Sequence, residues 1–193
     1  GANRHYIPNR PPLAVSPLVK LPIGRIEPKG WLLSQLQLMR GGFTGKLPEI
    51  SKFLKDDSGW ITLEGRCWEE MPYWLKGFGD MGYVLGDQRI IEEAKVWIDA
   101  TIASRQPDGW FGPLANKASG RDENKMPDLW PNMVMLNALQ SYYEYTQDAR
   151  VIDLMREYFK WELAVPDEQF LPPFWQQQRA GDNLASVHWL YNR

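Results

Sequence analysis

Cysteine and histidine are scarce in this 193-residue sequence, which contains one cysteine and two histidines. Because Cys67 has no second cysteine to pair with, an internal disulfide framework is excluded, and the few donors weigh against a zinc site built from these residues alone. No apolar run approaches the roughly 20 residues that a membrane-spanning helix needs. Lysine and arginine (22) nearly balance aspartate and glutamate (24), so the sequence lacks the basic excess of a nucleic-acid-binding protein.

Aromatic residues, in contrast, are abundant, with ten tryptophans, eight tyrosines and seven phenylalanines. A chain of this length can bury a core of its own, and some of these rings belong there. So many indole rings also suit a surface that stacks on a flat or sugar-like ligand. The composition therefore favours a protein that binds such a ligand over one that binds nucleic acid.

The first 30 residues differ from the rest of the chain. They are rich in proline and show no helical period, which predicts an extended N-terminal arm over residues 1–30. A helix is expected to follow Pro28 and to end at Gly41 and Gly42, with an apolar stripe that includes Trp31 and Leu36. A short helix is predicted near residues 49–55.

Two helical hairpins follow, and they repeat each other. Apolar residues recur at helical spacing over 72–85 and 90–104, and again over 133–143 and 151–159. The strings LGDQRIIEEAKVW (85–97) and TQDARVIDLMREY (146–158) match with a constant offset of 61 residues. A third helix is expected to start at Asp182. Repeated hairpins bury their faces only against neighbours, so we predict an all-α toroid of helical hairpins over 31–193, the incomplete N-terminal portion of an (α/α)6 barrel.

The connections predict where a ligand would bind. Turns within each hairpin are short, whereas the links between hairpins (105–127 and 160–181) are long and contain the stretch RQPDGWFGP. The long links should therefore lie at the same end as the first-helix starts, which bring carboxylates and indole rings together. The predicted substrate-binding residues are Trp68, Glu69, Asp108, Trp110, Asp128 and Trp130.

Structural alternatives stay open for these residues. Asp128 and Asp182 are also typical N-caps, and Trp68 and Trp130 also suit core packing. The adjacent Glu69 and Glu70 cannot both point into one cavity from a helix, so they do not form an acid/base pair.

Other residues favour plain structural roles. A buried, inert thiol is the preferred interpretation of Cys67 over a nucleophile, and a core side chain is the preferred interpretation of His188 over a ligand. His5 carries no signal. Asp122 and Glu123 are expected on a solvated face.

The residues from Trp68 to Pro113 resemble the first hairpin of glycoside hydrolase family 127, the β-L-arabinofuranosidase family. The stretch DLWPNMVMLNALQSYYEYTQDARVIDLMREYFKW resembles the next hairpin of that family, and DNLASVHWLYNR resembles the start of the third. The proline-rich segment before residue 40 is also similar to the first segment of the family. One departure is Pro127-Asp128-Leu129-Trp130, where the family typically has His-Glu-Leu-Tyr with a substrate-contacting histidine, and this puts the sugar preference in doubt.

The resemblance implies an (α/α)6 glycosidase barrel that acts on plant or bacterial glycans and releases L-arabinofuranose or a related sugar. It also implies a catalytic glutamate and a zinc-bound cysteine nucleophile from the latter half of the barrel. None of those positions matches this chain, so no catalytic residue and no zinc ligand is carried over. We expect the chain by itself to be inactive and to need the remainder of the barrel as its partner.

Two other functions remain open. The same toroid occurs in unsaturated-uronyl hydrolases and polysaccharide lyases, in which case Asp108 or Asp128 would be the acid/base. A non-catalytic glycan-binding scaffold would use the same aromatic end without cleaving its ligand. By analogy with such bacterial enzymes, a periplasmic or secreted location is expected, with the cytoplasm as the alternative.

Overall fold

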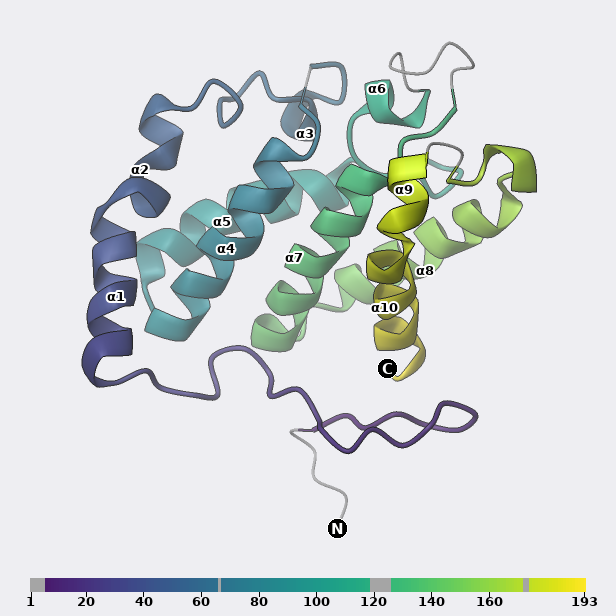
Figure 1. Cartoon of the computed structure of the whole chain (residues 1–193). Coiled ribbons are helices and arrows are strands. Elements are labelled where there is room, and N and C mark those ends of the chain that lie inside the picture. Colours follow the sequence, from purple (N-terminus) through teal and green to yellow (C-terminus); the bar gives the residue numbers. More distant parts are fainter. Residues whose placement is uncertain (1–5, 66, 119–125, 172–173) are drawn as a thin grey trace.

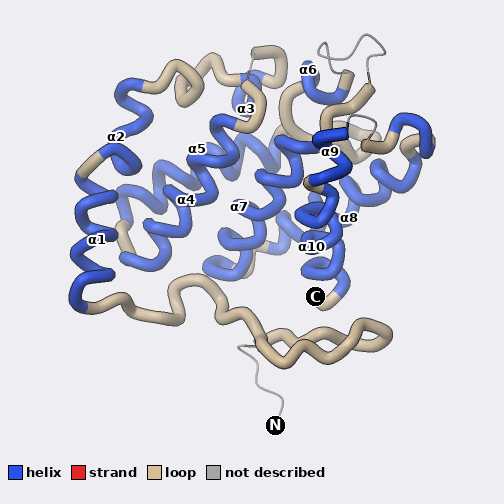
Figure 2. The backbone as a smooth tube through the Cα atoms, in the orientation of Figure 1, coloured by secondary structure: helices blue, strands red, loops and turns tan. Residues whose placement is uncertain are grey.

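The computed structural model describes residues 6–65, 67–118, 126–171 and 174–193, and within them all regular secondary structure is helical (Figures 1 and 2). The α-helices are α1 (Gly30–Gly41), α2 (Phe43–Ile50), α3 (Gly59–Thr62), α4 (Glu70–Leu85), α5 (Gln88–Ala103), α6 (Leu114–Lys117), α7 (Trp130–Thr146), α8 (Ala149–Ala164), α9 (Phe174–Gln178) and α10 (Ala180–Tyr191). A 3-10 turn, η1, spans Asp167–Gln169. None of the described helices is long and apolar enough to cross a membrane.

The helices form two layers, as the repeated hairpins predict. The first helices α4, α7 and α10 lie side by side in front, and the second helices α5 and α8 pack behind them (Figure 1). The most extensive contact joins α4 to α7, so the two hairpins share one core. The all-α hairpin fold, consistent with a portion of an α/α barrel, is therefore confirmed.

The hairpin turns repeat at the level of single hydrogen bonds. Gly86 and Gln147 end α4 and α7 in the left-handed region, with φ of 63° and 61°. The next residue then caps the second helix, because Asp87 accepts from the Ile90 amide (3.1 Å) and Asp148 from the Arg150 amide (3.0 Å). These caps explain why the offset of 61 residues is constant across both turns.

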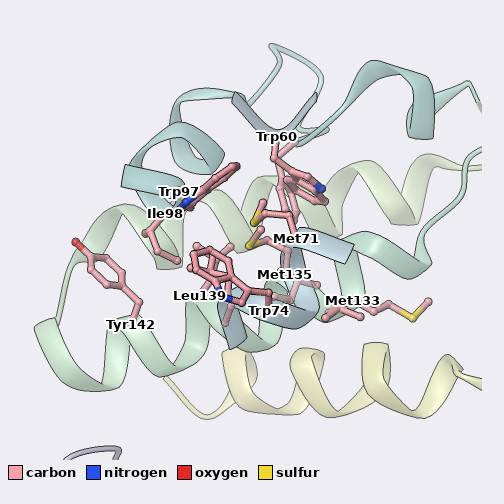
Figure 3. Close-up of a cluster of buried hydrophobic side chains, with 14 of the residues drawn as sticks. Trp60, Met71, Trp74, Trp97, Ile98, Met133, Met135, Leu139 and Tyr142 are labelled. Carbon is pink, nitrogen blue, oxygen red and sulfur yellow. The ribbon is translucent and has the colours of Figure 1, made fainter. Parts of the chain in front are cut away.

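Aromatic and sulfur-containing side chains fill the space between the layers (Figure 3). Trp74 of α4 stacks on Phe78 with ring centroids 4.3 Å apart and meets Trp97 of α5 edge-on at 6.1 Å. Met133 and Met135 of α7 are almost fully buried in the same core. Flexible thioethers suit the irregular gaps that remain between large rings.

The stripe of α1 lies at the edge of the layer, where Leu36 packs against the core and Trp31 is 76% exposed. One local prediction is wrong. The helix predicted near 49–55 lies earlier, at 43–50, and Ser51 leaves it with ψ of 129°. The turn that follows α2 is stabilised by Lys55, whose ammonium donates to the Pro48 carbonyl.

The described part of the arm, residues 6–29, contains no helix and runs under the ends of α7 and α10 (Figure 1). The Tyr191 hydroxyl donates to the Pro11 carbonyl, and the Asn192 amide donates to Asn9 Oδ1 (2.8 Å). The Arg10 guanidinium lies 4.1 Å from the centre of the Tyr191 ring. The start of the chain is thus bound to the last helix.

Candidate functional site

The described parts of the long links and the starts of α4, α7 and α10 lie at one end of the hairpins, opposite the arm (Figure 1). Two hydrogen bonds join the starts of α4 and α7 crosswise. The Trp68 indole donates to Asp128 Oδ2 at 2.8 Å, and the Trp130 indole donates to the Glu69 carboxylate. The predicted convergence of indoles and acids is therefore confirmed for these four residues, which we call the helix-start cluster.

Asp128 is the buried acid of the helix-start cluster, with 3% of its surface exposed. Its Oδ1 accepts from the Trp130 amide at 3.2 Å, and its Oδ2 accepts from the Trp68 indole. Leu129 is the N-cap residue of α7, so the N-cap interpretation of Asp128 is wrong, although both of its carboxylate oxygens bond to the protein itself.

Glu69 and Glu70 point to different partners, as their adjacency predicts. Glu70 Oε2 accepts from the Trp68 amide at 2.8 Å, whereas Glu69 turns toward Trp130 of the neighbouring helix. Glu69 is partly exposed, so its carboxylate is the acid of the helix-start cluster that a ligand can still reach. The two glutamates do not form an acid/base pair across one gap.

The segment before α10 completes this end of the molecule. The Arg179 guanidinium lies 4.5 Å from the centre of the Trp130 ring and 5.5 Å from that of Trp175. Trp175 meets Trp68 edge-on at 5.5 Å, and Gln176 accepts from the Leu129 amide at 3.0 Å. The sequence gives no signal for these residues, because the link 160–181 shows no period that would place them beside α7.

Tyr73 was also missed, although its spacing held a signal. It follows Glu69 by four residues and so lies on the same face of α4, 48% exposed and 6.0 Å from the Trp130 ring. Partial desolvation and the charge of Glu69 raise the pKa of Tyr73, and Arg179 opposes them. Its hydroxyl is therefore a neutral hydrogen-bonding group at physiological pH.

Trp110 requires a correction, because the structure buries its ring completely. The indole donates to the Gly112 carbonyl at 3.2 Å and packs edge-on against Trp161 at 4.9 Å. Phe111 is equally buried. The loop is aromatic because its rings anchor the link to α8, and an exposed stacking surface at Trp110 does not form.

Asp108 stays at the surface of that loop. Its carboxylate accepts from the Trp110 amide at 3.2 Å and pairs with the Lys117 ammonium. Although partial desolvation acts in the other direction, the bond from Lys117 holds the pKa of Asp108 below its usual value. The described partners of Asp108 are Trp110 and Lys117, which lie outside the helix-start cluster.

The remaining candidates have structural surroundings. Cys67 is 6% exposed, and burial raises the pKa of its thiol, which agrees with an inert side chain. His188 is only partly buried and borders a cavity, so the core interpretation is wrong. His5, Asp122 and Glu123 lie outside the described residues.

Whether these residues can bind zinc depends on which donor side chains the structure brings together. Within the described ranges, no group of three or more histidine, cysteine, aspartate and glutamate side chains is arranged to hold a metal ion. The nearest approach of a thiol to a carboxylate is Cys67 Sγ to Glu70 Oε2 at 4.0 Å, beyond any coordination pair. These residues do not fit a zinc centre.

The comparisons with known proteins assign this fold to a family. The family model described as "Beta-L-arabinofuranosidase, GH127 catalytic domain" matches residues 21–193, which include every described helix. Searches of curated proteins and of solved structures gave no significant match. The match begins inside the proline-rich arm and runs through all three hairpin starts.

Proposed function

Because the chain belongs to glycoside hydrolase family 127, the β-L-arabinofuranosidase family, we propose that it forms the substrate-binding N-terminal part of an enzyme that hydrolyses glycosidic bonds. The substrate would be a plant or bacterial glycan, and the product L-arabinofuranose or a related sugar. The family match over residues 21–193 carries this proposal.

The helix-start cluster is the proposed sugar-contacting region. Glu69 would accept a hydrogen bond from a sugar hydroxyl, and Tyr73 would donate or accept one beside it. Trp130 is only 4% exposed, so its indole would hold the Glu69 carboxylate in place and would not itself reach the sugar. Trp68 and Asp128 fix this geometry through their mutual hydrogen bond, so their proposed role, like that of Trp130, is to position Glu69.

Bond cleavage is not assigned to this chain. The helix-start cluster offers no pair of carboxylates across one gap, and the described residues show no fit for zinc, so we derive no step through a metal here. We propose that the catalytic groups lie elsewhere in the enzyme and that this chain alone binds the sugar without cleaving it. Export to the periplasm or secretion is part of the same proposal, and cell fractionation tests it.

The test uses the enzyme that contains this chain, an aryl β-L-arabinofuranoside and the variant Glu69→Gln. The amide keeps the shape and the contact with Trp130 but loses the charge, and we expect kcat/KM to fall about tenfold or more. Glu92→Gln is the control, because Glu92 is exposed on α5.

Unchanged kinetics in Glu69→Gln would refute the proposed role of the helix-start cluster. Absence of arabinose release from any substrate, with glycan binding retained, would favour the non-catalytic scaffold. The uronyl-hydrolase alternative receives no support here, because Asp128 accepts from Trp68 and from the Trp130 amide, and Asp108 pairs with Lys117.

A further inference from the structure

A cavity of about 770 Å³ lies between the arm and the far ends of α4, α7 and α10, opposite the helix-start cluster. In Figure 1 the arm closes this end of the molecule from below. The volume falls within the range of about 300–1,000 Å³ that small-molecule sites occupy. The lining includes Lys20, Asp80, Gln140, Glu144, Trp189 and Arg193.

Glu144 is a deeply buried charged group of this arm cavity, whereas its partner Lys20 is 66% exposed. The Glu144 side chain is 5% exposed and binds Lys20 at 3.3 Å, Arg193 at 3.3 Å and the Trp189 indole at 3.0 Å. The Arg193 guanidinium also lies 3.7 Å from the centre of the Trp189 ring. Glu144 thus has three partners, which are Lys20 of the arm, Trp189 of α10 and Arg193, and together they form one wall of the cavity.

Two buried polar atoms of the cavity residues have no hydrogen-bond partner among the described residues, Asp80 Oδ1 and Arg193 Nε. Burial raises the pKa of Asp80, although a hydrogen bond from Ser141 and the charge of Lys20 act in the other direction. Because the terminal carboxylate torsion is soft, either oxygen of Asp80 can turn to a ligand in the cavity. A buried carboxylate oxygen without a donor is costly, and a ligand hydroxyl would remove that cost.

We propose that the arm cavity binds an uncharged sugar unit, at a site separate from the helix-start cluster. Its walls carry charges of both signs, since Lys20, Arg25 and Arg193 line it together with Asp80 and Glu144, so neither an anion nor a cation meets a wall of one sign. Hydroxyl groups can donate to Asp80 and accept from Arg193 at once, which few other neutral ligands do. The choice of a sugar over another polyhydroxylated ligand rests on the proposed function.

The experiment measures L-arabinose and an arabinofuranosyl disaccharide by calorimetry in the enzyme that carries Glu69→Gln, so that the helix-start cluster contributes little. Two changes are then added in turn. Ala185→Trp fills the cavity from the exposed face of α10, and Asp80→Asn replaces the carboxylate without changing its shape. Leu163→Trp, at an 89% exposed position away from the cavity, is the control for an added indole.

We expect Asp80→Asn to weaken sugar binding about tenfold and Ala185→Trp to abolish it, with no change in the control. Thermal melting of each variant shows that it is folded. Binding that survives both changes, or no binding in the Glu69→Gln enzyme, overturns this inference. The proposed function fails on a different result, which is full hydrolysis by the Glu69→Gln enzyme.

Discussion

At the scale of single residues, indole nitrogens and carboxylates pair across two neighbouring helix starts. Trp68 and Trp130 each donate to an acid on the other helix, Asp128 and Glu69. Residue type alone suggests sugar recognition for all four, because stacking rings and hydroxyl-accepting acids are the groups that sugars require. The exposed fraction separates them, since Asp128 is buried and Glu69 is partly exposed.

Trp110→Ala should act on stability and not on substrate affinity. The ring is fully buried against Tyr158 and Trp161, and its removal leaves a cavity that costs about 3–5 kcal/mol. Urea unfolding measures this loss. A variant with wild-type stability and a raised KM would contradict this prediction and support the substrate-stacking role that the sequence suggested for Trp110.

Glu162 should make stability depend on pH near neutrality. Burial raises its pKa from 4.5 to about 7, and Asn183 donates to it at 2.7 Å. Between these two values the folded state holds a proton that the unfolded state has lost, so the free energy of unfolding falls as pH rises from about 4.5 to about 7. Glu162→Gln should remove this part of the fall. Parallel wild-type and variant melting profiles between pH 4.5 and 7.5 would contradict it.

At the scale of elements, the two hairpins use the same turn with different residues. Gly86 and Gln147 both adopt a left-handed conformation at a helix end. The sequence predicted both turns from the repeat, since a cap and a following aspartate are local features. It misplaced α2, which spans Phe43–Ile50 and not residues 49–55, because this short segment has no clear helical period of its own.

Gln147→Gly should stabilise the second hairpin by up to about 1 kcal/mol, because glycine adopts φ near 61° without the steric cost. The gain is reduced by losing the Gln147 side-chain bond to the Tyr143 carbonyl. Gly86→Gln is the matched control and should destabilise the protein, because φ of 63° is unfavourable for a residue with a Cβ. A Cβ at this position meets no atom within 4 Å, so only the backbone cost is measured. Changes of the same sign in both variants, measured by urea unfolding, would refute this account.

At the scale of the whole molecule, the arm connects the start of the chain to its last helix. Lys20 of the arm and Arg193 both form ion pairs with the carboxylate of Glu144 in α7. The arm therefore contributes a wall to the cavity as well as a contact between distant segments.

Glu144→Ala should destabilise the protein by about 3–5 kcal/mol, because it leaves buried cationic and indole groups unpaired. It should also speed hydrogen exchange in residues 6–25. Glu93→Ala is the control, since its surface pair with Arg89 is worth less than about 1 kcal/mol. Unchanged exchange in the arm would show that Glu144 does not hold it.

The sequence by itself determined the helical hairpins, their repeat, the caps of their turns and the family, because these depend on local spacing and residue order. Only the tertiary structure decided which rings face solvent, because a tryptophan in a loop gives the same sequence pattern whether its ring binds a ligand or anchors the loop to the core. Trp110 was placed in the core and Tyr73 at the surface by packing between elements far apart in the chain. The arm cavity likewise exists only because residues 7–25 meet the ends of three helices.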